Sequence, residues 1–580
     1  MARGPLRAGR DSSKSTGVWS RDWIIVVLLA IFLAAILARL FYVQIVKGAE
    51  YSDMAATSHT TEVSISAKRG TIYDRNGEVL ASNVKATTIY VNPKEVTAPI
   101  NVAQILYSVL GKKYDKTYDD YYALVTKSDT TFVYIQRKAS VKLAKKLKKR
   151  LNQDNLTGVH FLEDTKRVYP NDSTASQVVG NVDIDGKGIS GLEMQYNSLL
   201  AGTDGKMRVE QGLNQIPISD GQIEETKAED GEDIVISLDV RLQSRVEKTL
   251  LKAIKSYSAA GGTATVMDAS TGEVYASCSY SKSDSGSYSL DSGKLASFTD
   301  AYEPGSTFKT ATAISVLENK AVSTSSTFTV PYSMRVYDYT IHDSHSHGTE
   351  QMTFKQIIAE SSNVGTVLAS RKVKKSQLYK TYSKLGFGKD PGTDFPGTAS
   401  GTLEKSDDWD PVQAANISFG QGVLVTPAQI IRLYGAVEQN GVERVPHFLT
   451  DVPNDSDAKS SLTADLTKSK RVTSKSVCKD VKKMLRAVVT DGTGTKAKVK
   501  GFTVAGKTGT AEVASSSGGY GNGYIVSFCG WLDGSSSDLV CLVTIKQPKT
   551  EEGGGPVCGP VFSDIMSYAA ERYRINPNAG

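Results

Sequence analysis

An apolar run near the N-terminus constrains this chain more than any other feature. Every residue from Trp23 to Ala38 is apolar, and the apolar character resumes after Arg39 and continues to Val46. A helix of that length crosses a hydrocarbon core of about 30 Å, and Arg39 near its end can extend to the interface. Five basic residues precede the run: Arg3, Arg7, Arg10, Lys14 and Arg21. By the positive-inside rule we expect a cytoplasmic N-terminus.

A cleaved signal peptide is the alternative interpretation of this run. The apolar part of a signal peptide is about 7–15 residues long and precedes a small-residue cleavage site. The run here is longer and is followed by bulky residues. We therefore expect an uncleaved, single-pass anchor in the cell membrane, with the catalytic part of the chain extracytoplasmic. The expected segments are a cytoplasmic tail at 1–22 and a transmembrane anchor at 23–46.

Composition narrows the class of the remaining chain. A length of 580 residues predicts more than one domain, and 40% hydrophobic with 22% charged residues indicates a globular protein. The net charge of +6 is modest and does not indicate nucleic acid as a partner. Five scattered cysteines show no metal-ligand spacing. A Cys529–Cys541 bridge stays open, while buried free thiols are the simpler expectation.

Residues 47–232 read as a unit of mixed strands and helices. The segment Lys68–Ser82 predicts a hairpin that turns at Asp74–Gly77, because Asn-Gly is a strong hairpin signal. The segment Val141–Leu151 places leucines on one helical stripe with lysines around it, which indicates a helix with a solvated basic face.

Residues 233–580 read as a second unit, in which strands lie at both ends and helices in the middle. An alternating strand followed by helical periodicity is expected at 232–243. Strand patterns are expected in a hairpin that turns at 270–272, and at 501–513, 523–532 and 538–546, with a closing helix at 561–573. The Ser/Asp/Gly-rich segment 277–297 predicts a mobile surface loop. This order favours an α+β, three-layer architecture with an antiparallel sheet covered by helices.

The segment Tyr302–Ser315 carries the first candidate chemistry. A serine hydroxyl is a poor nucleophile until a base removes its proton, and no histidine lies in this segment. Ser306 and Lys309 follow Pro304 and Gly305 at the start of an apolar helix, so the two side chains share a face. Burial can lower the pKa of a lysine until it acts as a base. Ser-x-x-Lys also occurs elsewhere in the chain, so the helix start is what distinguishes this copy.

Two further motifs follow in order. Ser361 and Asn363 stand between two helical stretches, where a loop can direct them into a cleft. Lys507, Thr508, Gly509 and Thr510 lie on an alternating strand, where the glycine permits close approach of a ligand. Each motif alone is weak and has an ordinary structural explanation. The ordered set Ser-x-x-Lys, Ser-x-Asn, Lys-Thr-Gly is typical of the penicillin-interacting serine enzymes.

With these motifs the chain resembles a class B penicillin-binding protein, a monofunctional peptidoglycan D,D-transpeptidase, over nearly its full length. The division or sporulation branch is favoured, with the elongation branch as the alternative. The resemblance rests on "RLFYVQ", "RGTIYDRNGEVLA", "GISGLEMQYNSLLAG", "YEPGSTFK", "SSN", "FGQGVLVTPAQ" and "AGKTGTAE". It implies a penicillin-binding transpeptidase fold at 233–580, preceded by a dimerisation-like pedestal at 47–232.

The resemblance also implies a role for each motif residue. Ser306 is the nucleophile acylated by the stem peptide or by a β-lactam, and Lys309 is its general base. Ser361 relays a proton to the leaving amine, and Asn363 binds the substrate amide. Lys507 and Thr508 hold the terminal carboxylate. The backbone N–H groups of Ser306 and Thr510 form the oxyanion hole, which Gly509 leaves accessible.

The implied partners follow from the same family. They are peptidoglycan stem peptides, β-lactam antibiotics and the lipid bilayer, with no metal or organic cofactor. No stretch between the anchor and residue 232 resembles a glycosyltransferase, so the resemblance implies a SEDS-family glycan polymerase together with divisome or elongasome proteins. The segment His342–His347 has three histidines and Asp343, but its spacing matches no zinc motif. We expect it to line the cleft.

Three other functions are alternatives to a transpeptidase. A class A β-lactamase needs a glutamate that activates the deacylating water, yet no Glu-x-x-x-Asn occurs between Asn363 and Lys507. The D,D-carboxypeptidase alternative shares the fold. A catalytically silent wall-synthesis scaffold is the non-enzymatic alternative, and the intact motifs argue against it.

Overall fold

The computed structural model describes residues 19–48, 50–51, 60–210, 223–290, 293–514 and 520–578. The chain forms two compact units. One comprises residues 1–66 and 204–229, and the other comprises residues 67–203 and 230–580.

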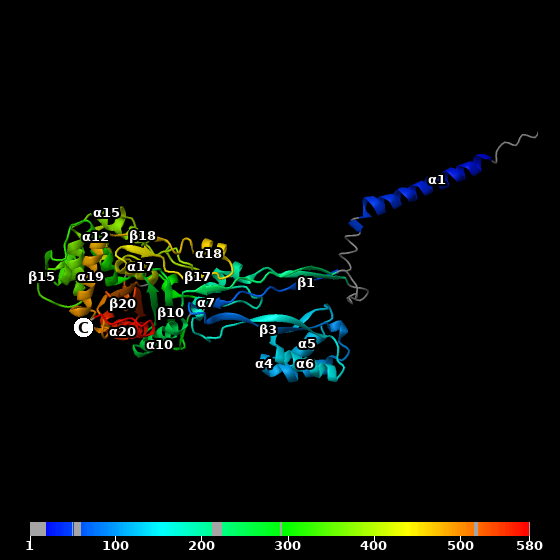
Figure 1. Ribbon diagram of the computed structural model, residues 1–580, viewed down its shortest axis with the longest axis horizontal. Coiled ribbons are helices and arrows are strands. Elements are labelled where there is room, and N and C mark those ends of the chain that lie inside the picture. Colours follow the sequence, from blue (N-terminus) through cyan, green and yellow to red (C-terminus); the bar gives the residue numbers. More distant parts are fainter. Residues whose placement is uncertain are drawn as a thin grey trace, which may run out of the picture. The chain divides into compact units, whose positions relative to one another are not determined.

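The first unit contains the apolar helix (Figure 1). Helix α1 (Trp19–Phe41) continues into a π-helical turn, η1 (Tyr42–Val46), so the predicted run is helical throughout. The span Trp23–Val46 contains an 18-residue stretch with a mean hydropathy of 3.0, and none of that stretch is buried. The unit also has a three-stranded antiparallel sheet of β1 (Thr60–Ile65), β6 (Gly205–Glu210) and β7 (Ile223–Thr226).

The second unit begins with a sheet whose order is β17-β8-β2-β3-β4, with β5 also paired to β3. These strands are β2 (Ile72–Tyr73), β3 (Val79–Val91), β4 (Val133–Ser140), β5 (Val159–Val168), β8 (Ile234–Ile236) and β17 (Leu449–Asp451). The predicted hairpin turn between β2 and β3 is confirmed. Asp74 Oδ1 accepts hydrogen bonds from the N–H groups of Asn76 and Glu78 at 2.7 and 2.9 Å, and Gly77 has a φ of +82°.

Helices cover one face of β3 and β4. They are α3 (Pro99–Leu106), α5 (Tyr118–Val125) and α6 (Val141–Gln153), and they enclose a small core that includes Leu106, Tyr121 and Leu147. Helix α6 confirms the predicted helix, with Leu147 and Leu151 buried and the lysines exposed.

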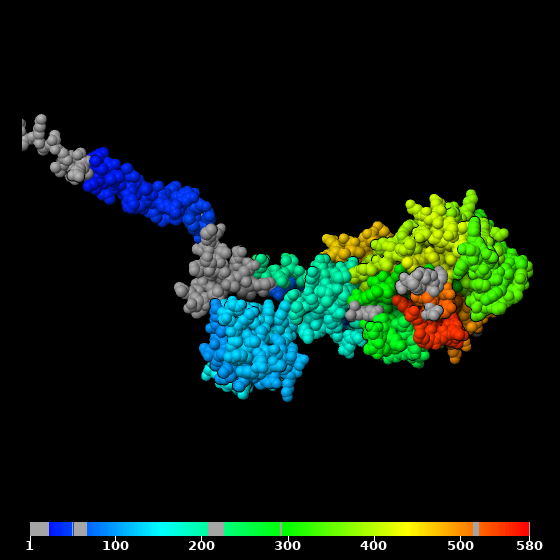
Figure 2. Space-filling model, turned by 180° about the vertical axis from the view of Figure 1, so that it is seen from behind, coloured from blue at the N-terminus to red at the C-terminus, as the bar shows by residue number. Residues whose placement is uncertain are grey.

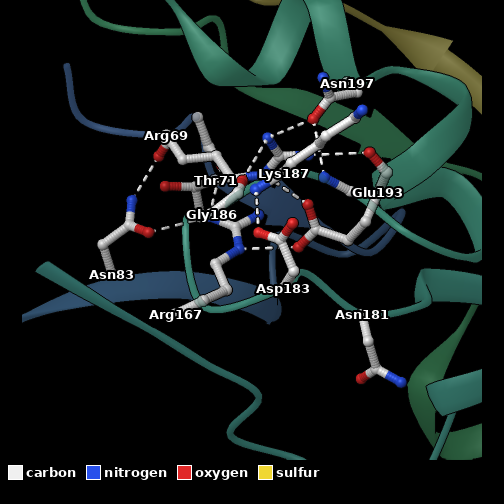
Figure 3. A network of polar contacts seen from close by, with 12 residues as sticks. Arg69, Thr71, Asn83, Arg167, Asn181, Asp183, Gly186, Lys187, Glu193 and Asn197 are labelled. Atoms are coloured by element: carbon white, nitrogen blue, oxygen red, sulfur yellow. Dashed lines mark hydrogen bonds and ion pairs between the residues drawn. The ribbon is translucent and has the colours of Figure 1, made fainter. Parts of the chain in front are cut away.

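A buried cluster of two arginines and one carboxylate joins distant segments of this region (Figure 3). Glu193 on α8 (Gly191–Gln195) is completely buried and accepts Nε–H bonds from Arg69 at 2.6 Å and Arg167 at 2.7 Å. Arg69 also donates to Asn197 Oδ1 at 2.9 Å, and Arg167 donates to the Gly70 carbonyl at 2.7 Å. Such a pair is costly to break, because the remaining charge stays buried without its partner.

The larger region is built on a six-stranded antiparallel sheet of order β11-β10-β9-β21-β20-β19. Its strands are β9 (Gly261–Asp268), β10 (Val274–Lys282), β11 (Tyr288–Leu290), β19 (Val504–Ala514), β20 (Tyr520–Leu532) and β21 (Leu539–Lys546). Strands from both ends of this region meet at the centre, where Leu539 pairs with Asp268 and Lys546 with Gly261. This confirms the expected antiparallel sheet.

Helices pack on both faces, which gives three layers. Helices α10 (Val240–Ser256) and α20 (Gly554–Arg572) share one apolar core with the sheet, and Figure 2 shows the red C-terminal helix against the green chain of the domain's first elements. Helices α12 (Lys309–Glu318), α17 (Pro427–Glu438) and α19 (Lys475–Thr490) lie on the other side (Figure 1). The predicted three-layer α+β fold is confirmed.

Two predictions for this region need correction. The described residues of the segment 277–297 form an exposed turn at 283–287 rather than a continuous surface loop, because β10 continues to Lys282, β11 follows, and Ser277 and Ser279 are buried. Their hydroxyls are satisfied there: Ser277 Oγ bonds Thr265 Oγ1 at 2.9 Å, and Ser279 Oγ accepts from Gln177 at 2.9 Å. The closing helix begins at Gly554 rather than near Val561.

The cysteines agree with the simpler expectation. All five are buried and free. Cys529 pairs with Leu542 and Cys541 with Gly530 on the adjacent strands, so the two cysteines are offset in register by one residue.

Candidate active site

Two glycines shape the turn that carries Ser306. Gly305 has a φ of +53°, and a Cβ there would lie 2.5 Å from the Thr510 carbonyl oxygen. Gly420 has a φ of +90°, and its Cβ would lie 2.1 Å from the Gly305 carbonyl oxygen, while the Gly305 N–H donates to the Gly420 carbonyl at 3.0 Å. Only glycine fits both positions. The 3₁₀ helix η4 (Gly305–Phe308) therefore packs closely against edge strand β19.

Helix α12 follows η4 and is buried from Lys309 to Leu317. The ring of Phe308 packs against Tyr382 and Phe387, with ring centroids 4.8 Å apart in both pairs. Ser306 is partly exposed, whereas Lys309 is completely buried. The predicted buried helix is thus confirmed, and its first turn leaves the hydroxyl accessible while the amine is kept dry.

The Lys309 ammonium is bonded to the second motif. Its Nζ donates to the Ser361 carbonyl, to Ser361 Oγ at 3.3 Å and to Asn363 Oδ1 at 2.7 Å. Burial lowers the pKa of Lys309 from its ordinary value of 10.5 to about 7, and the negative charge of Asp343 acts in the opposite direction. A substantial fraction of this lysine is therefore a neutral amine near pH 7.

The second motif lies in a loop between α13 (Phe354–Ala359) and α14 (Asn363–Ser370). Ser361 has a φ of +61°, which is a strained backbone conformation for a serine. Ser362 is the N-cap of α14, and its Oγ accepts the Gly365 N–H at 2.8 Å. Backbone strain of this kind persists where the surrounding contacts hold it, and Lys309 supplies one of them.

The end of β14 (Tyr339–His342) and the residue after it supply the other contacts that hold this loop. Asp343 is 7% exposed; its Oδ2 accepts from Ser362 Oγ at 2.6 Å, and its Oδ1 accepts from the Val364 N–H at 2.9 Å. Asn363 Nδ2 donates to the His342 carbonyl at 2.9 Å. No pattern in the sequence indicates this contact, because Asp343 and Ser362 lie in different elements, 19 residues apart. The described part of the chain contains no group of three or more His, Cys, Asp or Glu side chains that could hold a metal ion.

The third motif lies on β19. Lys507 is completely buried, and its Nζ donates to the carbonyl and the Oγ1 of Thr508, both at 3.3 Å. Thr508 Oγ1 is also 2.7 Å from Thr493 Oγ1. Burial lowers the pKa of Lys507 well below its ordinary value, and the positive charge of Lys309 lowers it further. The two lysines therefore act on each other electrostatically.

Gly509 and Thr510 complete this strand segment. A Cβ on Gly509 would lie 2.2 Å from Ser527 Oγ and 3.0 Å from the Thr307 side chain, so no larger residue fits. Thr510 is exposed and its Oγ1 accepts the Gly554 N–H at 3.3 Å. Its backbone lies beside Gly305 at the turn of Ser306.

The structure thus brings the predicted residues into two linked groups. Lys309, Ser361 and Asn363 are joined by hydrogen bonds, and Ser306 lies on the turn that packs against the strand of Lys507–Thr510. Among the described residues no hydrogen bond links Ser306 to Lys309 directly. A neutral amine has two N–H donors and one lone pair. When the Ser361 carbonyl and Asn363 Oδ1 accept these two donors, the lone pair of the neutral amine is available to a hydroxyl.

Comparison with known proteins agrees with this geometry. Residues 262–567 match the penicillin binding protein transpeptidase domain, and residues 64–236 match the penicillin-binding protein dimerisation domain. Stage V sporulation protein D of Bacillus subtilis is 30% identical over 93% of this chain and 83% of its own length. Peptidoglycan D,D-transpeptidase FtsI of Escherichia coli is 29% identical over 95% of this chain and 91% of its own length.

A solved structure is similar as well. Penicillin-binding protein 3 of Mycobacterium tuberculosis, complexed with aztreonam, superposes with a TM-score of 0.67 at 25% identity, and covers 89% of this chain and 98% of that one. Both domain matches and these full-length similarities agree with the motif order and the three-layer fold. The chain belongs to the class B penicillin-binding proteins, the monofunctional transpeptidases of peptidoglycan synthesis.

Proposed function

We propose that this peptidoglycan D,D-transpeptidase forms its acyl-enzyme on Ser306, with Lys309 as the general base. The observation that carries the proposal is the state of Lys309: it is buried, its pKa is lowered to about 7, and it is bonded to Ser361 and Asn363. A base with a pKa near the working pH is efficient in proton transfer.

In the first step the Ser306 proton passes to Lys309 Nζ, and Ser306 Oγ bonds to the carbonyl carbon of the penultimate D-alanine. The oxyanion that forms is stabilised by the N–H groups of Ser306 and Thr510, a contribution of about 3–4 kcal/mol per donor. The amide C–N bond then breaks, and the terminal D-alanine leaves as an amine that receives a proton through Ser361. Asn363 binds the substrate amide, and Lys507 with Thr508 holds the terminal carboxylate.

In the second step the amine of another stem peptide attacks the ester carbonyl. The attacking amine gives a proton to Lys309, a new amide C–N bond forms, the C–Oγ bond breaks, and Ser306 regains that proton from Lys309. A β-lactam follows the first step only, because its ring opens without releasing a group that makes room for the acceptor. Ser306→Ala in the full chain tests this assignment. We expect a fluorescent penicillin to label the wild-type chain covalently and to leave the variant unlabelled; labelling of the variant at another serine contradicts it.

The cellular role is septal division or spore cortex synthesis in this proposal. The similarity to stage V sporulation protein D supports a sporulation role, and the elongation role is the alternative. Depletion followed by microscopy distinguishes them: filaments indicate division, a defect confined to spores indicates cortex synthesis, and rounded cells contradict both.

The proposal includes a membrane topology for the chain and a set of protein partners. The helix at Trp23–Val46 and the basic residues before it support a cytoplasmic tail at 1–22 and extracytoplasmic units at 47–232 and 233–580. A transpeptidase that lacks its own glycan polymerase needs one nearby, which supports a SEDS-family partner together with divisome or elongasome proteins. Co-purification of the full chain with such a polymerase tests this, and its absence under mild detergent contradicts it.

A further inference from the structure

A carboxylate outside the three motifs is connected to the catalytic lysine. Lys309 Nζ donates to Asn363 Oδ1 at 2.7 Å, and Asn363 Nδ2 donates to the His342 carbonyl at 2.9 Å. The next residue is Asp343, whose carboxylate accepts from Ser362 Oγ at 2.6 Å and from the Val364 N–H at 2.9 Å. The loop after β14 is therefore bonded to three consecutive residues of the second motif region.

Asp343 has one more partner, which makes it sensitive to pH. The Nε2 of His347 lies 3.0 Å from Asp343 Oδ2, and the side chains of the two residues are 16% and 6% exposed. On the other side of the ring, His347 Nδ1 is 2.6 Å from the Gly348 carbonyl. Asp343 thus lies between a titratable imidazole and the loop that contacts Lys309.

We propose that Asp343 is a positioning residue for acylation: it holds the Ser361–Asn363 loop against Lys309, its negative charge acts on the Lys309 ammonium, and His347 modulates that charge. The inference rests on the proposed function, in which Lys309 is the base.

The positioning part follows from strain and capping. Ser361 is held at a φ of +61°, a strained conformation for a serine that persists only where neighbouring contacts hold it. The Ser362 hydroxyl accepts the Gly365 N–H and donates to Asp343, so the orientation of its O–H is fixed. Asp343 therefore holds the residue next to the strained position and the first turn of α14.

The electrostatic part follows from the charges around Lys309. The positive charge of Lys309 acts on Lys507 of β19, and the negative charge of Asp343 acts on Lys309 and raises its pKa. Glu360, at the end of α13, acts on Lys507. Loss of the Asp343 charge leaves burial as the influence on Lys309, and burial lowers its pKa.

His347 acts on the far side of Asp343. Its pKa is raised, first by the hydrogen bond to Asp343 and also by Glu350. When His347 is protonated, its positive charge offsets the Asp343 carboxylate and disfavours the Lys309 ammonium. The two residues therefore have opposite effects on the proton of Lys309.

The test is the pH dependence of the second-order rate of acylation by a fluorescent penicillin, measured on the full chain in detergent micelles. The acid limb of this profile reports the deprotonation of Lys309. For Asp343→Asn we expect the limb to move to lower pH by roughly half a unit or more. For His347→Gln, which keeps a neutral donor, we expect it to move to higher pH. Asp338→Asn, on the same hairpin but exposed, is the matched control and should not move it.

A third variant tests positioning. Asp343→Ala removes the acceptor for Ser362 and Val364, and we expect acylation to slow roughly tenfold or more at every pH, with Asp343→Asn recovering part of that loss. Melting temperatures of all variants verify folding. Superimposed profiles for wild type and Asp343→Asn, shifts of the same sign in Asp343→Asn and His347→Gln, or a wild-type rate in Asp343→Ala would each overturn the inference. Failure of the proposed base is distinguishable, because Lys309→Ala would then acylate normally.

Discussion

Lys309 Nζ lies 2.7 Å from Asn363 Oδ1, although 54 residues separate them in the chain. The hydrogen bond unites the first two motifs before any substrate arrives. It also fixes the amine inside a buried site, where its pKa is about 7. Most of the expected behaviour of the enzyme follows from this one placement.

The first prediction concerns the rate of acylation. Lys309→Met keeps the length of the side chain and removes the base, so we expect penicillin acylation to slow roughly 100-fold to 10,000-fold. In the wild-type chain the rate should rise with pH through about 7 and then level off, because the neutral amine is the active form. Stopped-flow or gel-based labelling measures both. Near-normal acylation of Lys309→Met would remove the lysine from its role.

The second prediction concerns stability. Lys309 titrates near 7 in the folded protein and near 10.5 when unfolded, so between these values the unfolded chain binds one proton more. The stability contribution of Lys309 therefore rises with pH, by at most about 1.4 kcal/mol per unit. The wild type should gain melting temperature relative to Lys309→Met from about pH 7 to about pH 9. A constant difference would mean that folded Lys309 keeps its proton.

The third prediction concerns Gly420. In Gly420→Ala the new Cβ would lie 2.1 Å from the Gly305 carbonyl oxygen, at a φ of +90°. We expect the Ser306 turn to shift and penicillin labelling to fall roughly tenfold or more. Gly392→Ala is the control, since its φ is +72° and nothing lies within 4 Å of its Cβ position. It should share the backbone strain and keep the labelling; equal losses in both variants would argue against the contact.

The fourth prediction concerns the buried charge cluster. Glu193→Gln leaves Arg69 and Arg167 without their carboxylate, which should cost about 3–5 kcal/mol of stability. Asp185→Asn is the comparison, because its pair with Arg137 is at the surface, with Asp185 68% exposed, and should cost under about 1 kcal/mol. Thermal unfolding followed by fluorescence measures both. Similar melting temperatures for the two variants would contradict the difference in burial.

The fifth prediction concerns the anchor. A chain without residues 21–46 lacks the unburied apolar helix, so we expect it to stay in the supernatant without detergent and to react with fluorescent penicillin. Ultracentrifugation and gel fluorescence measure the two properties. Recovery only as unreactive, sedimenting material would show that the remainder needs the membrane segment to fold.

The sequence predicts the motifs well because each carries its own local signal. The turn before Ser306 needs glycine, the strand of Lys507 alternates, and the hairpin at Asp74–Gly77 has Asn-Gly; all three are local in the chain. The predicted assignment of roles to Ser306, Lys309 and the other motif residues stays a prediction until the variants are measured.

Long-range polar contacts are what the sequence does not indicate. Ser277 and Ser279 suggested a loop because serine is common in loops, but partners such as Thr265 and Gln177 satisfy them inside the sheet. Asp343 was missed for the same reason, since its partner Ser362 lies in another element. The sequence alone therefore predicts exposure for a buried polar residue whose hydrogen-bond partner is distant in the chain.

The central pairing of β9 with β21 has a consequence for biosynthesis. Ribosomes complete the strand of Leu539–Lys546 long after the helix of Ser306 has been translated, so the nascent polypeptide at first has only β9, β10 and β11 of this sheet. Half of the six-stranded sheet stays unpaired, with its apolar side chains uncovered, until β19, β20 and β21 have been translated. Premature stop codons anywhere before those segments should therefore give material for proteolysis rather than a partial enzyme.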